Sequence, residues 1–470
     1  GQSKMITHLT DLEEKFSQLK VRCRRFMMQC NGGLIGFPKI KKKPITASSS
    51  GPVAGVLAGK FFANSLDLTD VITFDVGGTS TDISIIKDNQ ISITIESELE
   101  RHPMQIPMVD FITIGAGGGS VVWIDSGQGL RVGPRSAGAD PGPVCYNKGG
   151  EDPTTTDAML RCGIINPEKF LGGKMVLSSD KAGRALEEKI SNVLSISSEQ
   201  AAVSSIQVAI ANIAEGIKSV SVGKGLDPRD FVLVAFGGAG PMFGSFVAAE
   251  LGSPVVLIPP RPGITSAFGI LATDIKSDFV VTKICIDEDI SPAEISSLFG
   301  KLEARALGDL EDEMDGKEIL IFRSIDLRYF GQSFELNVPV PRRDLIEEDI
   351  RSIRKAFFHK HEQVYGHFFE DKPVQYVKLR VTAVIKKDPP DLSRAPMIDF
   401  ESGDPLIEKR TVFLPMGKFT TPVYNRRRMR TGYVIEGPCI VEQMDSTTLL
   451  LPDDKGKVTE NGSLIIERMG

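Results

Sequence analysis

Two aspartates bracket a pair of adjacent glycines in the stretch Asp75-Val76-Gly77-Gly78-Thr79-Ser80-Thr81-Asp82. The apolar segments on either side, 71–74 and 83–86, predict two strands that meet at this glycine tip. A backbone without a Cβ can approach an anion closely, and its N–H groups, together with neighbouring hydroxyls, donate to phosphate oxygens. The residues predicted to bind a phosphate in this way are Gly77, Gly78, Thr79 and Ser80. The alternative is an ordinary hairpin turn whose glycines supply a positive φ.

The carboxylates around this turn predict the chemistry beside the phosphate. Asp75 ends the first predicted strand, where it can hold a hydrated Mg²⁺ or orient a water, so we predict it as a catalytic residue and a metal ligand. Two roles remain open for Asp82, which is either a second metal ligand or a cap that accepts from backbone N–H groups. Asp110 lies shortly before a glycine-rich run, 115–120, from which residues 111–114 separate it, and is predicted as a second catalytic carboxylate.

A second glycine-rich junction follows the predicted strand 231–236. Its glycines are Gly237, Gly238 and Gly240, and a helix is predicted to begin at Pro241. A strand, a glycine turn and a helix in this order aim the helix N-terminus at a ligand. We predict a ligand platform here, and the alternative is a tight junction between strand and helix.

An aspartate, a cysteine and a group of histidines elsewhere in the chain could also take part in chemistry. Asp157 follows three threonines and is either the cap of a helix or a metal or substrate ligand. Cys145 is predicted to be a packed, inert thiol, because the chemistry above needs no thiolate. The histidines at 359, 361 and 367 have spacings of two and six, which do not place them on one helical face, so no metal cluster is predicted.

Composition narrows the class of protein. The net charge of −6 argues against a nucleic-acid-binding protein. The two short basic clusters, 41–43 and 426–428, are predicted to be solvated loops. Six scattered cysteines without a Cys-x-x-Cys pair favour the cytoplasm over a disulfide framework. No apolar run is long enough to span a bilayer, so no membrane partner is expected.

The order of predicted elements divides the chain into three parts. Residues 1–45 are predicted to be a helical and linking segment, with helical periodicity over 6–29. Strands and helices alternate over 46–277, which is typical of an α/β domain. Strand-like segments dominate 278–470 around one charged helix, which predicts a C-terminal β-rich α+β domain.

Ordered motifs along nearly the whole chain resemble those of hydantoinase A, the ATP-binding subunit or domain shared by N-methylhydantoinases, 5-oxoprolinases and the acetone and acetophenone carboxylases. The motifs that carry this resemblance are 31–33, 50–55, 75–82, 114–120, 131–134, 136–139, 141–146, 153–158, 235–241, 328–332 and 437–442.

The resemblance implies an actin-like ATPase (ribonuclease H-like) lobe, with 75–82 at the phosphates and Gly237, Gly238 and Gly240 at the adenosine. It implies ATP and Mg²⁺ as cofactors, and phosphorylation of a carbonyl or enol oxygen of a cyclic amide or related substrate. A hydantoinase B-type subunit is the expected partner in a hydrolase complex. The alternative is an ATP-binding or non-catalytic assembly subunit of an acetone- or acetophenone-type carboxylase.

Three departures from the family pattern favour that alternative. Relatives carry an earlier hairpin of the 75–82 type in an N-terminal lobe, which is expected to be absent or supplied by another polypeptide. They usually carry histidine where Ile112 and Phe243 stand. Neither isoleucine nor phenylalanine binds a metal or relays a proton, so these two positions bear on the chemistry more than on nucleotide binding.

Overall fold

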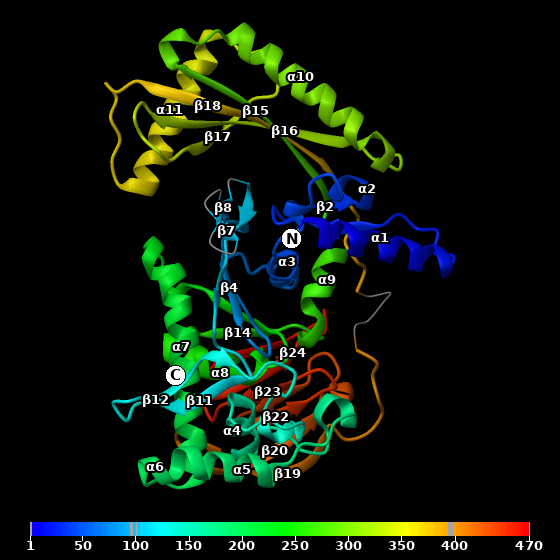
Figure 1. The fold of residues 1–470 in the computed structure, drawn as a ribbon, viewed down its shortest axis with the longest axis vertical. Helices are drawn as coiled ribbons and strands as arrows, with labels where there is room; N and C mark the ends of the chain where they lie inside the picture. Colours follow the sequence, from blue (N-terminus) through cyan, green and yellow to red (C-terminus); the bar gives the residue numbers. More distant parts are fainter. Residues whose placement is uncertain (1, 95–96, 100–101, 105, 393–397, 470) are drawn as a thin grey trace. The chain divides into compact units, whose positions relative to one another are not determined.

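The computed structural model describes residues 2–469 except 95–96, 100–101, 105 and 393–397. The chain forms two compact units, each built from two separate stretches (Figure 1). One unit contains residues 1–48 and 273–388, and the other contains residues 49–272 and 389–470. Both units are discontinuous because strands distant in sequence pair in one sheet in each of them.

The larger unit, 49–272 with 389–470, is organised around a nine-stranded sheet. Its central strand β3 pairs antiparallel with β4 and parallel with β13, which pairs parallel with β14. A short strand, β5 (Gln90–Ile91), pairs with β4 beside this path. The order across the sheet is β10 (Ile112–Ile114), β4 (Thr81–Lys87), β3 (Val71–Val76), β13 (Val232–Phe236), β14 (Val255–Ile258), β25 (Leu464–Arg468), β24 (Asp454–Val458) and β21 (Val434–Glu436).

Small residues let a helix lie close to this sheet. Helix α3 (Ser50–Asn64) packs on α9 (Thr265–Leu271) and on β3. A Cβ added at Gly59 would lie 2.5 Å from Thr73 Cγ2, and one at Gly55 would lie 2.8 Å from the ring of Phe236. The small residues of this helix therefore allow it to pack closely against the sheet.

A second sheet in this unit comes from the C-terminal stretch. Its strands are β19 (Leu406–Leu414), β20 (Gly417–Asn425), β22 (Cys439–Glu442) and β23 (Thr447–Leu450). Helix α8 (Gly240–Leu251) packs on β23. Val412, Val423 and Leu449 share one hydrophobic core with Ile72 and Phe74 of the first sheet. The C-terminal stretch is therefore built into the core of this unit.

The smaller unit, 1–48 with 273–388, contains a six-stranded sheet. Helices α10 (Pro292–Leu310) and α11 (Glu347–Tyr365) pack on its strands, and α1 (Gln2–Gln18) precedes it in sequence. The helix predicted over 6–29 is shorter than expected, since the chain enters a strand at Phe26. The strand order is β1 (Phe26–Met28), β2 (Leu34–Gly36), β15 (Ile275–Ile286), β18 (Val374–Ile385), β16 (Ile319–Tyr329) and β17 (Leu336–Val340).

This grouping differs from the linear division into 1–45, 46–277 and 278–470. Residues 278–388 stay with the N-terminal 48 residues, because β2 pairs with β15. Residues 389–470 instead join 49–272, because β25 pairs antiparallel with β14. Long-range strand pairing of this kind leaves no local pattern in the sequence.

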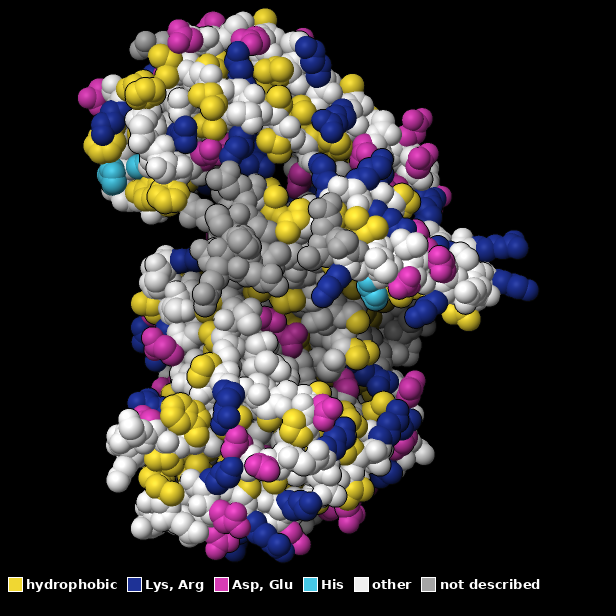
Figure 2. Space-filling view, viewed as in Figure 1, with side chains coloured by type: hydrophobic (Ala, Val, Ile, Leu, Met, Phe, Trp, Pro, Cys, Tyr) yellow, Lys and Arg dark blue, Asp and Glu magenta, His cyan; other side chains and the backbone are white. Residues whose placement is uncertain are grey.

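The visible surface is mixed in charge. Figure 2 shows Lys and Arg side chains interspersed with Asp and Glu on this face. Among the described residues, no helix has both the length and the apolar character needed to cross a membrane. The six cysteines, all within the described part of the chain, form no disulfide.

Candidate functional site

The predicted glycine-tipped hairpin is present in the larger unit. Asp75 lies opposite Asp82 in the β3–β4 register, and the Gly77 N–H donates to Ser80 O at 3.0 Å. Gly78 and Thr79 are exposed at the tip, and their N–H groups have no hydrogen-bond partner among the described residues. The turn therefore presents free main-chain donors to its surroundings.

Conformation does not explain the glycines of this turn. Neither Gly77 nor Gly78 is among the described residues with positive φ. A Cβ at Gly78 would meet no protein atom within 4 Å, and one at Gly77 would meet only Ser80 O, at 3.7 Å. An ordinary turn that needs glycine for its φ is thus excluded, and the space over Gly78 is open to a ligand.

The two carboxylates lie at the base of the turn. Ser266 Oγ donates to Asp75 Oδ2 at 3.0 Å, and Thr113 Oγ1 donates to Asp82 Oδ1 at 2.6 Å. The pKa of Asp75 is raised to about 6, mainly by burial; the Ser266 hydrogen bond lowers it and the nearby charge of Asp82 adds a smaller rise. Burial also raises the pKa of Asp82. Two adjacent carboxylates with so few donors favour a bound cation.

The donor set fits Mg²⁺ better than a metal held by protein alone. In the described ranges, no group of three or more His, Cys, Asp or Glu residues is arranged to hold a metal ion. Mg²⁺ is commonly held by one or two carboxylates, with water and substrate phosphates as its other ligands. Asp75 and Asp82 provide such a pair. Asp82 accepts a hydrogen bond from the hydroxyl of Thr113 rather than from a backbone N–H, so a capping role for Asp82 is not supported.

The second glycine junction lies directly against the first. Gly237 has φ 83°, and a Cβ there would lie 2.2 Å from Asp75 Oδ1 and 2.5 Å from Val76 O. The Ala239 N–H donates to Val76 O at 3.0 Å, and α8 begins at Gly240. Gly237 thus forms the tight junction that helps bury Asp75. Gly238 differs from it, since a Cβ there would meet nothing within 4 Å.

A third glycine run contacts the 75–82 hairpin and supports it. Gly118 N donates to Gly77 O at 2.9 Å, and Gly119 N donates to Gly78 O at 2.6 Å. A Cβ at Gly119 would lie 2.8 Å from Gly78 O. Thr156 in turn donates to Gly118 O through its N–H at 2.7 Å and through its hydroxyl at 2.8 Å. The run 115–120 therefore fixes the hairpin through main-chain contacts that leave no room for a side chain.

Asp157 is a structural cap. It is fully buried at the start of α4 (Thr155–Arg161) and forms a capping box with Thr154. It also accepts from the N–H groups of Val144 at 3.2 Å and Cys145 at 2.7 Å. These bonds hold Thr156 in place, so Asp157 acts on the hairpin only through its neighbours. Burial and the adjacent Asp157 raise the pKa of Cys145 far above its ordinary value, in keeping with an inert thiol.

A cavity of about 480 Å³ adjoins these glycines. Three of the predicted residues line it: Gly77, Gly78 and Gly238. Thr79, Ser80, Gly237 and Gly240 do not line it, and neither do the carboxylates Asp75 and Asp82. The residues that the sequence did not suggest come from a loop and from the C-terminal stretch: Asn166, Lys169, Phe170, Leu171, Glu401, Arg427, Arg428, Glu442, Gln443, Met444, Asp445, Ser446 and Thr447.

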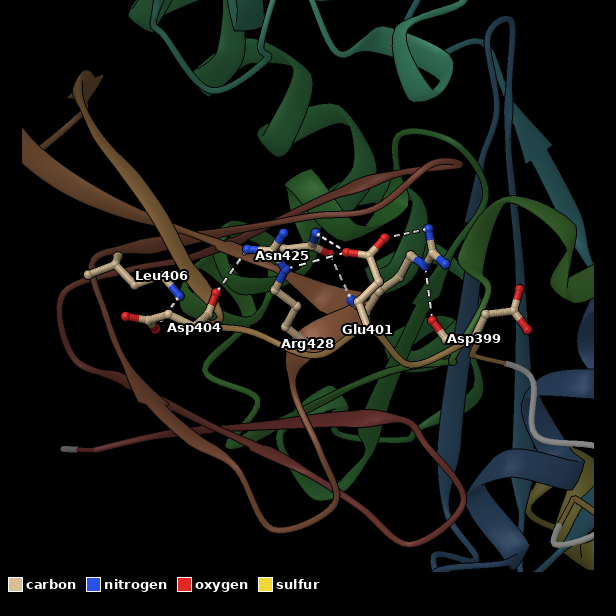
Figure 3. Close-up of polar contacts among 7 residues, drawn as sticks. Asp399, Glu401, Asp404, Leu406, Asn425 and Arg428 are labelled. Atoms are coloured by element: carbon tan, nitrogen blue, oxygen red, sulfur yellow. Dashed lines mark hydrogen bonds and ion pairs between the residues drawn. The ribbon is translucent and has the colours of Figure 1, made fainter.

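The expectation of a solvated loop at Arg426–Arg428 is wrong. Arg426 is buried and donates to the main-chain oxygens of Met429 and Gly462. Arg427 Nη1 lies 2.8 Å from Glu401 Oε1, and Arg428 Nε lies 3.4 Å from Glu401 Oε2. Figure 3 shows Glu401 beside Arg428 and Asn425, whose Nδ2 donates to Glu401 at 3.3 Å. The cavity rim is thus an ion-paired network in which Glu401 offsets the arginine charge.

Asp110 is not brought to the cavity. Its carboxylate forms an ion pair with Lys224, and its main-chain oxygen accepts from Ser84 Oγ at 2.7 Å. Ile112 lies on β10 and is partly buried, whereas Phe243 is buried in α8. The two positions where the family resemblance implies histidine are therefore filled by residues that pack in the core.

Comparison with known proteins finds relatives that match most of the chain. A model of the hydantoinase/oxoprolinase family matches residues 2–279, and a model of the hydantoinase/oxoprolinase C-terminal domain matches residues 287–465. The caprolactamase subunit alpha of Pseudomonas jessenii is 34% identical over 460 residues, which cover 95% of this chain and 65% of that protein. The acetophenone carboxylase gamma subunit of Aromatoleum aromaticum is 31% identical, with 94% and 62% covered.

Two solved structures share the fold. The ATP-dependent caprolactamase of Pseudomonas jessenii superposes with a TM-score of 0.84 at 31% identity, covering 99% of this chain and 68% of that one. A nucleotide-free acetone carboxylase superposes with a TM-score of 0.80 at 23% identity, covering 98% and 67%. The chain spans slightly less than two thirds of the length of the curated relatives it matches first.

Proposed function

Because this chain belongs to the hydantoinase/oxoprolinase family, we propose that it binds ATP with Mg²⁺ and phosphorylates a carbonyl oxygen of a cyclic amide or related substrate. Phosphorylation makes the amide carbon electrophilic enough for hydrolysis. On this proposal the chain is the ATP-binding component of a hydantoinase- or oxoprolinase-type hydrolase complex in the cytoplasm, with a hydantoinase B-type subunit as its partner. The relatives named as subunits support a multi-subunit assembly.

The observation that carries the proposal is the open hairpin tip. Gly78 has no positive φ, and a Cβ there would meet no protein atom within 4 Å, so the fold itself does not require glycine at this position. Gly78 also lines the cavity. The strand order β10-β4-β3-β13-β14, antiparallel on one side of β3 and parallel on the other, is also typical of an actin-like, ribonuclease H-like ATPase lobe. Both features support the nucleotide site predicted at 75–82.

Each group of this site has a role in phosphoryl transfer. The N–H groups of Gly78 and Thr79 donate to phosphate oxygens, and the brace at 117–119 keeps them in place without reorganisation. Asp75 and Asp82 hold Mg²⁺, which when bound neutralises phosphate charge. Asp75 is ionised above about pH 6, so it can act as a ligand at neutral pH. Gly238, at the start of α8, offers an unhindered surface to the nucleoside.

A second candidate function is an ATP-binding or non-catalytic assembly subunit of a carboxylase complex. The observation that favours it concerns Asp110, the other predicted catalytic residue. Its carboxylate is paired with Lys224, and Asp110 does not line the cavity. Ile112 and Phe243 also favour this second function, because both pack in the core. The two candidates differ in whether the chain itself turns over ATP.

The test is ATP hydrolysis by the protein with its co-purifying subunits, using 5-oxoproline, caprolactam and acetone as substrate probes. We expect Mg²⁺-dependent turnover that a cyclic amide stimulates and that Asp75→Asn lowers by about 100-fold or more. Asp110→Asn is the matched control, because its carboxylate is already taken up by an ion pair with Lys224. A folded Asp75→Asn protein with full turnover contradicts the assignment of Asp75. Nucleotide binding without any turnover favours the assembly subunit.

A further inference from the structure

We infer that the turn between β22 and β23 recognises the nucleoside of the bound nucleotide through Glu442 and Ser446, an inference that rests on the proposed ATP site. Glu442 ends β22, and Ser446 directly precedes β23. Both residues line the same cavity as Gly77, Gly78 and Gly238. The turn belongs to the C-terminal stretch, so the proposed pocket is completed by residues from the far end of the chain.

Both side chains are buried with polar atoms unsatisfied. Glu442 is 9% exposed and Ser446 is 7% exposed. Glu442 Oε1 is paired with Arg410, whereas Glu442 Oε2 and Ser446 Oγ have no hydrogen-bond partner among the described residues. The nearest recorded cation to Oε2 is Lys169 Nζ at 3.6 Å, which is too far for a hydrogen bond.

Unsatisfied buried groups indicate what the ligand must offer. A buried acceptor or hydroxyl without a partner is costly, so such groups are normally paired. A carboxylate only accepts, and a hydroxyl both donates and accepts. The matching ligand therefore carries an O–H or N–H donor beside an acceptor, which is the chemistry of ribose hydroxyls and of the amino edge of adenine.

The rest of the cavity suits a flat heterocycle. Tyr146 and Phe170 both line it, with ring centroids 5.7 Å apart, and Met242 of α8 adds a further apolar contact. The volume of about 480 Å³ lies in the ordinary range for small-molecule sites. Arg427 and Arg428 at the rim are already paired with Glu401, whereas the β22–β23 turn offers the unpartnered Glu442 Oε2 and Ser446 Oγ.

The test measures nucleotide affinity in Glu442→Gln and Ser446→Ala. Calorimetric titration of the full protein with Mg²⁺-ATP, Mg²⁺-dATP and Mg²⁺-ITP reports the affinity and the group recognised. We expect Glu442→Gln to weaken ATP binding by about 10- to 100-fold and Ser446→Ala by about 3- to 10-fold. If Glu442 contacts the ribose, wild-type protein prefers ATP over dATP and Glu442→Gln loses that preference. If it contacts the base, the same holds for ATP over ITP.

A matched control separates recognition from loss of an ion pair. Glu408 also pairs with Arg410, at 3.1 Å, but does not line the cavity. Glu408→Gln should therefore bind ATP as the wild type does. Unchanged affinity and selectivity in Glu442→Gln and Ser446→Ala, with wild-type protein binding ATP, overturn this inference alone. Failure of wild-type protein to bind any of the three nucleotides overturns the proposed function as well.

Discussion

Asp75 is a carboxyl group that becomes less acidic when the chain folds. Burial raises its pKa to about 6, so between about pH 4 and pH 6 the folded state keeps a proton that the unfolded state has lost. The free energy of unfolding should therefore fall as pH rises through this interval. A shift of about two pKa units corresponds to at most about 3 kcal/mol.

We predict that Asp75→Asn is more stable than the wild type at pH 7.5, by about 1–3 kcal/mol. The amide carries no charge to desolvate, so the decline in stability between pH 4 and pH 6 should also flatten. Urea unfolding at several pH values from 4.5 to 7.5 measures both effects. A variant that is less stable at every pH, with the wild-type slope retained, would show that the carboxylate is not held at an energetic cost.

Single residues differ in how far the sequence could predict their roles. Asp75 and Gly78 could be identified from the sequence, because both strands and the turn of their hairpin are contiguous in the chain. Glu442 and Arg427 were not, because they reach the cavity only after β22 pairs with β20 and β23. A signal was nevertheless present, since Glu442 ends the motif 437–442 and Arg427 lies in a basic run.

At the scale of elements, the glycine run 115–120 supports the 75–82 hairpin through main-chain hydrogen bonds. We predict that Gly119→Ala lowers stability by about 1–3 kcal/mol, because the new Cβ would press on Gly78 O at 2.8 Å. The hairpin must then shift, so Mg²⁺-ATP affinity should fall as well. Thermal unfolding and nucleotide titration measure the two effects.

Gly183→Ala is the matched control for that substitution. Gly183 lies in helix α5 (Ser179–Leu186), and a Cβ there would meet nothing within 4 Å. Alanine should be neutral or slightly stabilising at this position, since it favours a helix more than glycine does. Equal behaviour of the two variants would mean that the run does not brace the hairpin.

Elements were predicted well where their signals are local. The two strands beside the 75–82 turn and the helix that Asp157 caps follow from residues close together in the chain. The helix predicted over 6–29 was too long, because apolar residues beyond Gln18 continue a helical spacing while the chain forms β1 and β2. Periodicity alone cannot distinguish a helix from a short apolar strand.

At the scale of the whole molecule, the main difference from the sequence-based division is the role of residues 389–470. Strand β25 covers the edge of β14, and Val412, Val423 and Leu449 fill the core that Ile72 shares. No local pattern in the sequence predicts the pairing of β25 with β14, because it joins segments about two hundred residues apart. The α/β character of 46–277 was predictable, and the completion of its sheet was not.

We therefore predict that a chain ending at residue 388 does not form a stable larger unit. Its loss would uncover the β14 edge and a large apolar surface, and exposed edges of this kind promote aggregation. Solubility, resistance to limited proteolysis and cooperativity of thermal unfolding measure the effect. Co-expression of residues 389–470 as a separate polypeptide is the control, because it should restore the β14–β25 pairing and with it nucleotide binding. If the chain ending at 388 were soluble, unfolded cooperatively and bound Mg²⁺-ATP with wild-type affinity, residues 389–470 would be neither part of this core nor part of the pocket.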